Sequence, residues 1–354
     1  MNDVAPWWLP GGNLQTIWPA LAARRFVAAP PTYRRERWDT PDGDFVDVDF
    51  GADARLGVQA VVATPMAGTT IPTIGTPGSA GRPLLVLFHG LEGSSRSHYA
   101  EAFADWCAAH AIAYAVPHFR GCSGELNRGP RAYHSGDFEE IDWILRRLRA
   151  RHTAQGGGPL LAVGISLGGN ALMRWAGEMG AAAAGVADAV AAVSSPLDLS
   201  AGGHAIGRGF NRLVYTRMFL NTMKPKALAK LAQHPGLFDR AALLAARDLY
   251  AFDQHFTAPL HGFRSTEDYW ARASAKPHLP RIRIPALLVN ALNDPFVPAA
   301  SLPRPREVGP LVTLWQPRHG GHVGFAQGRP PGHVRSMPEA VGLWLMRQVN
   351  GARQ

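Results

Sequence analysis

The sequence predicts an α/β protein with a mostly parallel, doubly wound sheet. Continuous apolar runs such as Leu84–Phe88 are typical of strands buried on both faces. These runs alternate with helical stretches, and strand–helix–strand order favours parallel pairing. The alternation stops at residue 199 and resumes near residue 281, which indicates an insertion. A chain of 354 residues has a normal length for such a core with an insertion.

The first 81 residues contain an aromatic segment, two short β-like runs and an uncharged stretch. Residues 7–19 (WWLPGGNLQTIWP) combine aromatic side chains with turn residues. We expect strands at 45–50 and 58–63. Residues 66–81 are rich in Thr, Gly and Pro and carry no charge, which predicts a long hairpin loop.

From residue 84 the predicted elements follow one another in a regular order. We expect strands at 84–88, 111–116, 160–165 and 189–193, and helices at 97–110, 137–151 and 167–179. After the break, strands at 286–290 and 311–315 and a last helix at 338–349 complete the pattern.

Residues 199–280 contain helical stretches and no convincing strand. We therefore predict a helical cap insertion at 199–280 and a core formed by residues 1–198 and 281–354. An independent domain is the alternative, but no linker composition flanks the segment. Apolar residues of the insertion could either wall a substrate pocket or form the insertion's own core; they are Phe210, Leu213, Tyr215, Met218 and Phe219.

The composition favours a globular protein and argues against a nucleic-acid partner. The chain is 46% hydrophobic and 18% charged, with a net charge of +9. Of the 36 basic residues 32 are arginines, a skew typical of a GC-rich coding sequence, and they are scattered. The densest run, 146–151, falls on a predicted helix.

The cysteine count and the hydropathy pattern predict no disulfide framework, no zinc site and no membrane span, and we expect no metal and no cofactor. Cys107 and Cys122 are too few for a disulfide framework, and no Cys/His cluster has zinc-ligand spacing. Cys107 lies in an apolar helical stretch and is expected to be a buried small side chain. No apolar run reaches the roughly 18 residues of a membrane span. The first ten residues lack a basic start and an apolar core, so we expect no signal peptide and a cytoplasmic location.

One motif points directly to chemistry. The pentapeptide Gly164–Gly168 fits the pattern G-x-S-x-G, with a predicted strand before it and a predicted helix after it. That context is typical of the nucleophile elbow, a tight turn that lifts a serine above the sheet. The motif predicts Ser166 as a nucleophile.

A serine hydroxyl is a weak nucleophile without a base, so Ser166 requires a histidine and an acid that orients it. In hydrolases with such an elbow the chain order is serine, acid, histidine. Asp294 follows the predicted strand 286–290, and His322 follows the predicted strand 311–315. Asp198 is the rival acid and His319 is the rival base.

The anion formed when serine attacks a carbonyl needs two hydrogen-bond donors. We expect the backbone N–H of Leu167, directly after the serine, and that of Leu91, in the loop after strand 84–88. His89 is expected to order this loop without transferring protons. Arg120 is expected to tie loops together, with binding of an anionic substrate as the alternative.

Seven motifs, in order along nearly the whole chain, resemble one family. They are GNLQTIWP (12–19), HGLEGSSRSHY (89–99), FRGCSGE (119–125), GISLGGN (164–170), STEDYW (265–270), NDPFVP (293–298) and GGHVGF (320–325). Together they resemble the YheT-like branch of the α/β-hydrolases, the AB hydrolase 4 family. The resemblance implies the α/β-hydrolase fold and hydrolysis of carboxylic esters, often with medium-chain acyl groups. It also supports Ser166, Asp294 and His322 as the catalytic residues.

These observations predict a carboxylesterase-type serine hydrolase that acts on a small-molecule ester with a short or medium acyl chain. An acyltransferase would use the same residues and pass the acyl group to an alcohol. A lipid or phospholipid esterase is the third reading. The aromatic segment 7–19 fits either packing within the protein or contact with a lipid surface, and packing is the simpler of the two.

Overall fold

The computed structural model describes residues 5–27, 29–51 and 81–351. The predicted strand 58–63 and all of the predicted loop 66–81 except Gly81 lie outside the described residues. Within them, eight strands form one sheet in the order β1-β2-β4-β3-β5-β6-β7-β8. The strands are β1 (Tyr33–Asp39), β2 (Phe45–Gly51), β3 (Leu84–Phe88), β4 (Ala113–Pro117), β5 (Leu160–Ile165), β6 (Ala189–Val193), β7 (Ala286–Val289) and β8 (Val312–Trp315).

The six strands from β3 to β8 are parallel, and β1 and β2 add an antiparallel edge. Every residue of β3, β5 and β6 is buried, as the continuous apolar runs predicted. Strand β1 (YRRERWD) was missed because of its charges. Those charges are satisfied across the sheet: Arg35 and Arg37 lie directly opposite Asp49 and Asp47 of β2 and form ion pairs with them at 2.7 and 2.9 Å.

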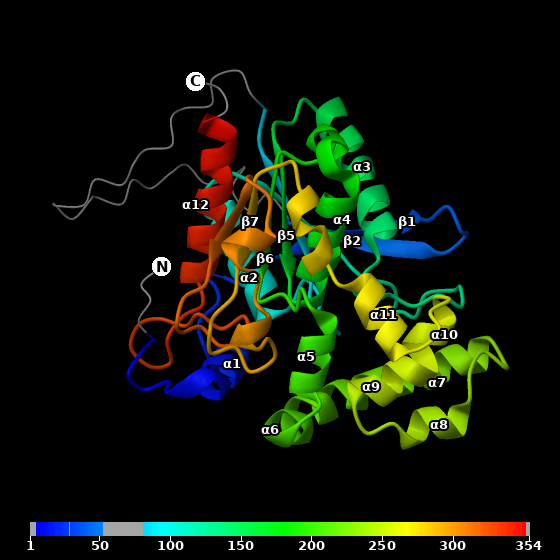
Figure 1. Ribbon diagram of the computed structural model, residues 1–354. Coiled ribbons are helices and arrows are strands. Elements are labelled where there is room, and N and C mark those ends of the chain that lie inside the picture. Colours follow the sequence, from blue (N-terminus) through cyan, green and yellow to red (C-terminus); the bar gives the residue numbers. More distant parts are fainter. Residues whose placement is uncertain (1–4, 28, 52–80, 352–354) are drawn as a thin grey trace.

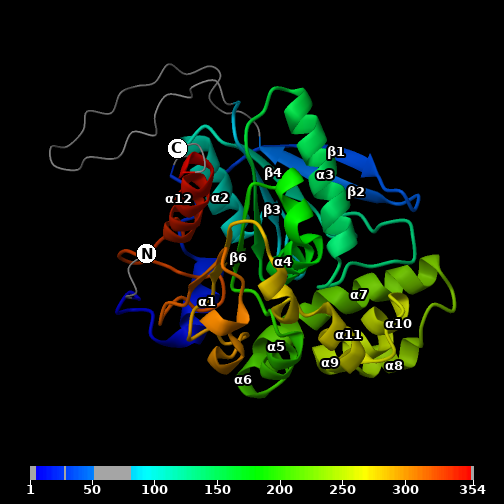
Figure 2. The same cartoon turned by 45° about the horizontal axis from the view of Figure 1, so that its top comes forward.

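Helices cover both faces of the sheet, as Figure 1 and the tilted view of Figure 2 show. The main helices of the core are α1 (Gly11–Leu21), α2 (His98–Ala109), α3 (Phe138–Ala154), α4 (Leu167–Met179) and α12 (Ser336–Gly351), with short 3₁₀ turns at η1 (Gly180–Gly185), η5 (Ala299–Ser301) and η6 (Pro305–Glu307). Helices α3 and α4 form one hydrophobic cluster with one face of the sheet, and α2 and α12 form the second cluster with the other. This arrangement confirms the predicted doubly wound α/β class.

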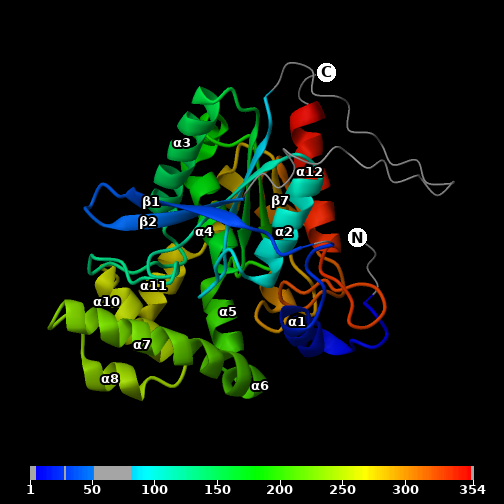
Figure 3. The same cartoon turned by 180° about the vertical axis from the view of Figure 1, so that it is seen from behind.

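The chain between β6 and β7, described throughout, contains helices and no strand. It comprises α5 (Leu199–Ile206), α6 (Gly209–Asn211), the π-helix η2 (Arg212–Thr216), α7 (Arg217–Gln233), α8 (Arg240–Ala245), α9 (Leu249–Phe252), the π-helix η3 (Asp253–Thr257), α10 (Ala258–Leu260), α11 (Thr266–Ala273) and the 3₁₀ turn η4 (Lys276–Arg281). Seen from behind in Figure 3, α5 to α11 gather at the end of the sheet where the parallel strands terminate. Open α/β sheets bind ligands at that edge.

Candidate active site

Ser166 lies in a tight turn between β5 and α4, where its backbone has φ +52° and ψ −117°. An L-residue adopts such a conformation only at a cost of about 1–3 kcal/mol, and such strain is concentrated at functional sites. The glycines of the motif allow the turn because side chains have no room there. A Cβ on Gly164 would lie 2.5 Å from the carbonyl oxygen of Gly168, and a Cβ on Gly168 would lie 2.5 Å from that of His89.

A chain of two hydrogen bonds connects Ser166 to Asp294 through His322. The Nε2 atom of His322 lies 2.9 Å from Ser166 Oγ, and its Nδ1 atom lies 2.9 Å from Asp294 Oδ2. Carboxylate oxygens accept, so Nδ1–H donates to Asp294 and Nε2 is left to accept from the serine hydroxyl. The other oxygen of Asp294 accepts the backbone N–H groups of Phe296 and Val297 at 2.8 and 3.3 Å.

The rival acid and base are not part of this arrangement. Asp198 caps helix α5 by accepting the N–H of Ala201 at 3.0 Å. His319 is exposed at the surface. The two predicted loops therefore meet at Ser166 through His322 and Asp294, and these two side chains are almost fully buried there.

Both predicted anion donors lie beside Ser166 in the same cavity. The N–H of Leu167 is the first of helix α4, so it has no partner inside the helix. In the loop after β3, the N–H of Gly90 donates to the hydroxyl of Tyr99 at 2.9 Å and that of Glu92 to the hydroxyl of Tyr133 at 3.1 Å. Between these two engaged groups, the N–H of Leu91 has no acceptor among the described residues.

His89 and Arg120 have structural contacts of the kind that the sequence predicted. His89 Nδ1 lies 2.7 Å from the carbonyl of Gly90, and its Nε2 accepts the N–H of Phe119 at 3.1 Å. Burial lowers the pKa of His89 to about 3, so the ring stays neutral and joins two loops. The buried guanidinium of Arg120 is paired with three carboxylates, those of Asp42, Asp44 and Glu140, at 2.8, 3.1 and 2.6 Å.

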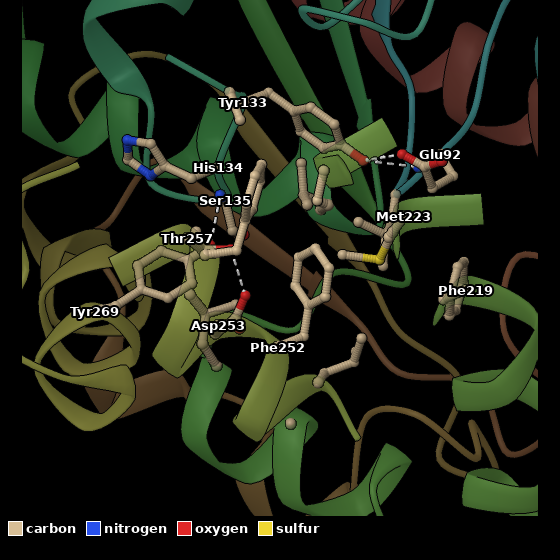
Figure 4. Close-up of a pocket in the computed structure, with 18 of the residues that line it drawn as sticks. Glu92, Tyr133, His134, Ser135, Phe219, Met223, Phe252, Asp253, Thr257 and Tyr269 are labelled. Carbon is tan, nitrogen blue, oxygen red and sulfur yellow. Dashed lines mark hydrogen bonds between the residues drawn. The ribbon is translucent and has the colours of Figure 1, made fainter. Parts of the chain in front are cut away.

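A cavity of about 170 Å³ extends from Ser166 into the helical segment between β6 and β7 (Figure 4). The apolar side chains that this segment contributes to the walls include Ile206, Phe219, Met223, Leu249, Phe252 and Phe256. Of the five insertion residues considered as pocket walls from the sequence, only Phe219 lines this cavity. Tyr215 instead packs against Phe296 with the ring centroids 4.5 Å apart. Phe210, Leu213 and Met218 are at least half exposed, because they lie on the outer face of the helices that run through η2.

The cavity also contains an acidic side chain that the sequence analysis missed. Asp253 of the π-helix η3 accepts hydrogen bonds from Thr257 Oγ1 at 2.6 Å and from Trp270 Nε1 at 2.8 Å. Burial raises the pKa of Asp253 to about 6. No basic side chain is within ion-pair distance of it among the residues that the structure describes.

Two residues of helix α1 hold the loops of the acid and the base, and no role was assigned to them from the sequence. Gln15 Oε1 accepts the side-chain amide of Asn293 at 2.9 Å and the N–H of Gly320 at 3.0 Å. Thr16 Oγ1 accepts the N–H of His322 at 2.9 Å. The only signal was their place in the motif GNLQTIWP, as polar residues inside an apolar segment.

The described residues contain no group of three or more His, Cys, Asp or Glu side chains that could hold a metal ion. Cys107 is fully buried in the core, as expected. In the same part of the chain, no helix is both long and apolar enough to cross a membrane.

Comparison with known proteins agrees with this geometry. The family described as alpha/beta hydrolase fold matches residues 83–328. The chain belongs to the α/β-hydrolase family. It is 38% identical over 318 residues to the putative esterase YheT of Escherichia coli, covering 89% of this chain and 84% of that protein. It is 27% identical to mouse phospholipase ABHD3, covering 92% of this chain and 75% of that protein. The resemblance to the YheT-like branch, predicted from seven motifs, is confirmed.

Solved structures of other α/β-hydrolases share the fold at low sequence identity. The Pyrococcus furiosus esterase Pf2001 aligns with a TM-score of 0.50 at 14% identity, covering 92% of this chain and 95% of that one. Est1E from Butyrivibrio proteoclasticus aligns with a TM-score of 0.50 at 15% identity, covering 91% and 100%. These two comparisons support the fold of this α/β-hydrolase.

Proposed function

We propose that this α/β-hydrolase cleaves carboxylic esters through an acyl-enzyme intermediate on Ser166. The observation that carries the proposal is the chain of hydrogen bonds from Ser166 through His322 to Asp294, whose serine and histidine line a largely apolar cavity. A serine, a base and an orienting acid in this geometry are the requirements for activating a hydroxyl group.

In the proposed reaction Ser166 Oγ attacks the ester carbonyl carbon while His322 Nε2 takes the hydroxyl proton. The carbonyl oxygen becomes an anion and accepts hydrogen bonds from the N–H groups of Leu91 and Leu167. When the tetrahedral intermediate collapses, the bond to the alcohol oxygen breaks and His322 returns the proton to the departing alcohol. Water then attacks the acyl group by the same route, releasing the acid and restoring Ser166. Asp294 keeps His322 oriented and stabilises its cation.

The substrate we propose is a small-molecule ester with a short or medium acyl chain held in the apolar cavity. We propose residues 199–280 as a helical cap on a core formed by 1–198 and 281–354, because cap side chains provide most of the apolar cavity wall. Transfer of the acyl group to an alcohol is the alternative reaction. A lipid or phospholipid ester is the alternative substrate, and it is favoured by the relatives named phospholipase ABHD3 and by the yeast relative named monoacylglycerol lipase.

A fluorophosphonate probe and a panel of nitrophenyl esters of graded acyl length test the proposal. The wild type should be labelled and should hydrolyse the esters, and Ser166→Ala should lose both properties. Ser200→Ala is the matched control, because Ser200 lies on α5 outside the chain of hydrogen bonds. Labelling that persists in Ser166→Ala would contradict the assignment. Product analysis with an added alcohol separates hydrolysis from acyl transfer.

A further inference from the structure

The cap contains a long basic stretch without compensating acids. From residue 199 to residue 238 there is no Asp or Glu, whereas the stretch contains three arginines and three of the four lysines of the chain. The lysines have partners within the protein: Lys226 pairs with Glu92 at 2.9 Å, and the buried Lys230 donates to the carbonyls of Asn127 and Gly129. Lys224 likewise donates to backbone carbonyl groups.

The three arginines of this stretch behave differently. Arg208, Arg212 and Arg217 are exposed, and within the described chain none of them forms an ion pair. Their positive charge is therefore available at the surface, on the helical run formed by α6, η2 and the start of α7.

The same helical run exposes four large apolar side chains. The exposed fractions are 50% for Phe210, 72% for Leu213, 37% for Val214 and 52% for Met218. Single exposed apolar residues are ordinary, but four within nine consecutive residues form a contiguous patch, which is typical of an interaction site. We call these four residues, together with Arg208, Arg212 and Arg217, the cap patch.

The cap patch lies at the same end of the molecule as the cavity. Phe219 directly follows Met218 and lines the cavity that contains Ser166. The inward side of the run is already packed, because Tyr215 contacts Phe296 and Thr216 donates to the carbonyl of Ile206 at 2.7 Å. The apolar side chains of the cap patch therefore have no room in the protein's own core.

Helix α1 adds a second apolar stripe beside the cap patch. The hydroxyl of Tyr215 donates to Asn13 Oδ1 at 3.0 Å, so α1 contacts the helical run at η2. On α1 the exposed side chains are Leu14, Trp18 and Leu21, which are spaced four and three residues apart and so share one helix face.

We propose that the cap patch docks the enzyme onto an anionic lipid surface, with the cavity entrance turned toward ester-bearing lipids. Arginines attract anionic headgroups, and the neighbouring apolar side chains enter the boundary between headgroups and acyl chains. A nucleic acid would use the arginines but would leave Leu213 and Met218 exposed to water. The role that we give to this docking rests on the proposed esterase function. Binding to a lipid surface can nevertheless be measured without any ester hydrolysis.

Sedimentation with vesicles tests the docking, using Ser166→Ala protein so that no lipid is consumed. Binding should be strong to vesicles of phosphatidylcholine with phosphatidylglycerol, weak to phosphatidylcholine alone, and reduced by salt. The triple change of Arg208, Arg212 and Arg217 to Gln should weaken binding on the order of 100-fold, since each basic residue contributes about tenfold or less. Leu213→Ser with Met218→Ser should weaken it by about tenfold or more.

Arg306→Gln with Leu311→Ser is the matched control. Both residues are exposed, and both precede β8, so they lie at the opposite edge of the parallel sheet from Ser166. This control should bind like the parent. Equal loss in the control, no binding of the parent to either vesicle, or binding to a DNA duplex in place of vesicles would each overturn the proposal.

The same substitutions in the active enzyme separate this proposal from the proposed function. Hydrolysis of a soluble nitrophenyl ester should stay within about twofold of the wild type, which also shows that the variants fold. Loss of probe labelling and of soluble-ester hydrolysis in the wild type would contradict the esterase proposal while leaving the vesicle result intact. If the parent protein does not bind the vesicles while the wild type hydrolyses the soluble ester normally, only the docking proposal is contradicted.

Discussion

The hydroxyl of Tyr133 contacts Glu92 at two points. It accepts the backbone N–H of Glu92 at 3.1 Å and donates to the carboxylate at 2.8 Å (Figure 4). Glu92 has a positive φ of 57° and directly follows Leu91, and its carboxylate also pairs with Lys226 of the cap. The backbone that presents the N–H of Leu91 is thus held from the core and from the cap together.

Tyr133→Phe removes both contacts and should lower the turnover number about tenfold while changing KM little. The reason is that the N–H of Leu91 acts mainly on the anion in the transition state, and removal of such a donor outright costs 10²–10³-fold. Steady-state kinetics with a soluble ester measures both constants. Tyr250→Phe, which loses only a surface contact with Glu267, should match the wild type. A Tyr133→Phe enzyme with unchanged turnover would mean that the loop holds its shape without this contact.

Asp294→Asn should lower turnover on the order of 10⁴-fold, because the amide does not stabilise the His322 cation and can present its NH2 group to Nδ1, which favours the wrong tautomer of the ring. Asp198→Asn should remain near the wild-type rate, since asparagine also caps a helix well. Turnover of the two variants is compared after circular dichroism confirms folding. If Asp198→Asn is the slower of the two enzymes, the catalytic acid is Asp198 and not Asp294.

His322→Ala should lower turnover by about 10⁴-fold or more, because no other base contacts the hydroxyl of Ser166 among the described residues. His319→Ala removes an exposed ring three residues earlier and should leave the rate unchanged within about twofold. Labelling with the fluorophosphonate probe should follow the same ranking. If His319→Ala instead lowers turnover strongly, this loop must rearrange before catalysis.

Gly164→Ala should destabilise the protein by about 2–3 kcal/mol or more, since the new methyl group would meet backbone atoms of Gly168 and Gly169 at 2.5 Å. Gly185→Ala is the control, because nothing lies within 4 Å of a Cβ at that position. Its effect should stay within about 0.5 kcal/mol. Urea unfolding gives both values. Equal stability of the two variants would show that the turn at Ser166 can relax.

Asp253→Asn should change how stability depends on pH. The pKa of Asp253 is raised to about 6 in the folded state from an ordinary value near 3.8, so folding favours the protonated carboxyl. Its contribution to stability is complete below pH 4 and is lost as the pH rises through 6. The free energy of unfolding of the variant should therefore gain up to about 3 kcal/mol on that of the wild type between pH 4 and pH 8. Urea unfolding at several pH values measures the difference, and parallel curves would contradict the prediction.

The sequence predicted most accurately the strands whose burial is uniform. The runs 84–88, 160–165 and 189–193 are buried along their whole length, and the structure places strands at these same residues. Strand β1 was missed because its arginines are balanced by Asp47 and Asp49, which no local pattern reveals. The motif order also identified the residues that meet at Ser166, because neighbouring parallel strands end at one edge of the sheet.

Contacts between distant parts of the chain could not be predicted from the sequence. Gln15 and Gly320 are 305 residues apart, and no periodicity links them. The pocket walls were predicted from apolar residues alone, but the helical run through η2 turns Tyr215 inward and leaves Leu213 at the surface. Which of these side chains face the cavity depends on how the helices of the cap pack against one another and against the sheet.

Gln15 and Thr16 of helix α1 hold the loops of Asp294 and His322 in place. The active site therefore needs contacts that the folding of the sheet does not need. The sheet and its two hydrophobic clusters do not include helix α1, so a polypeptide cleaved between α1 and β1 would keep its spectroscopic signature of structure. Without α1 in place it would nevertheless lose the two acceptors, Gln15 Oε1 and Thr16 Oγ1, that hold the loops of Asp294 and His322. The contact between Thr16 and His322 joins residues that are 306 positions apart, so the active site is complete only when the two ends of this long loop of chain have met.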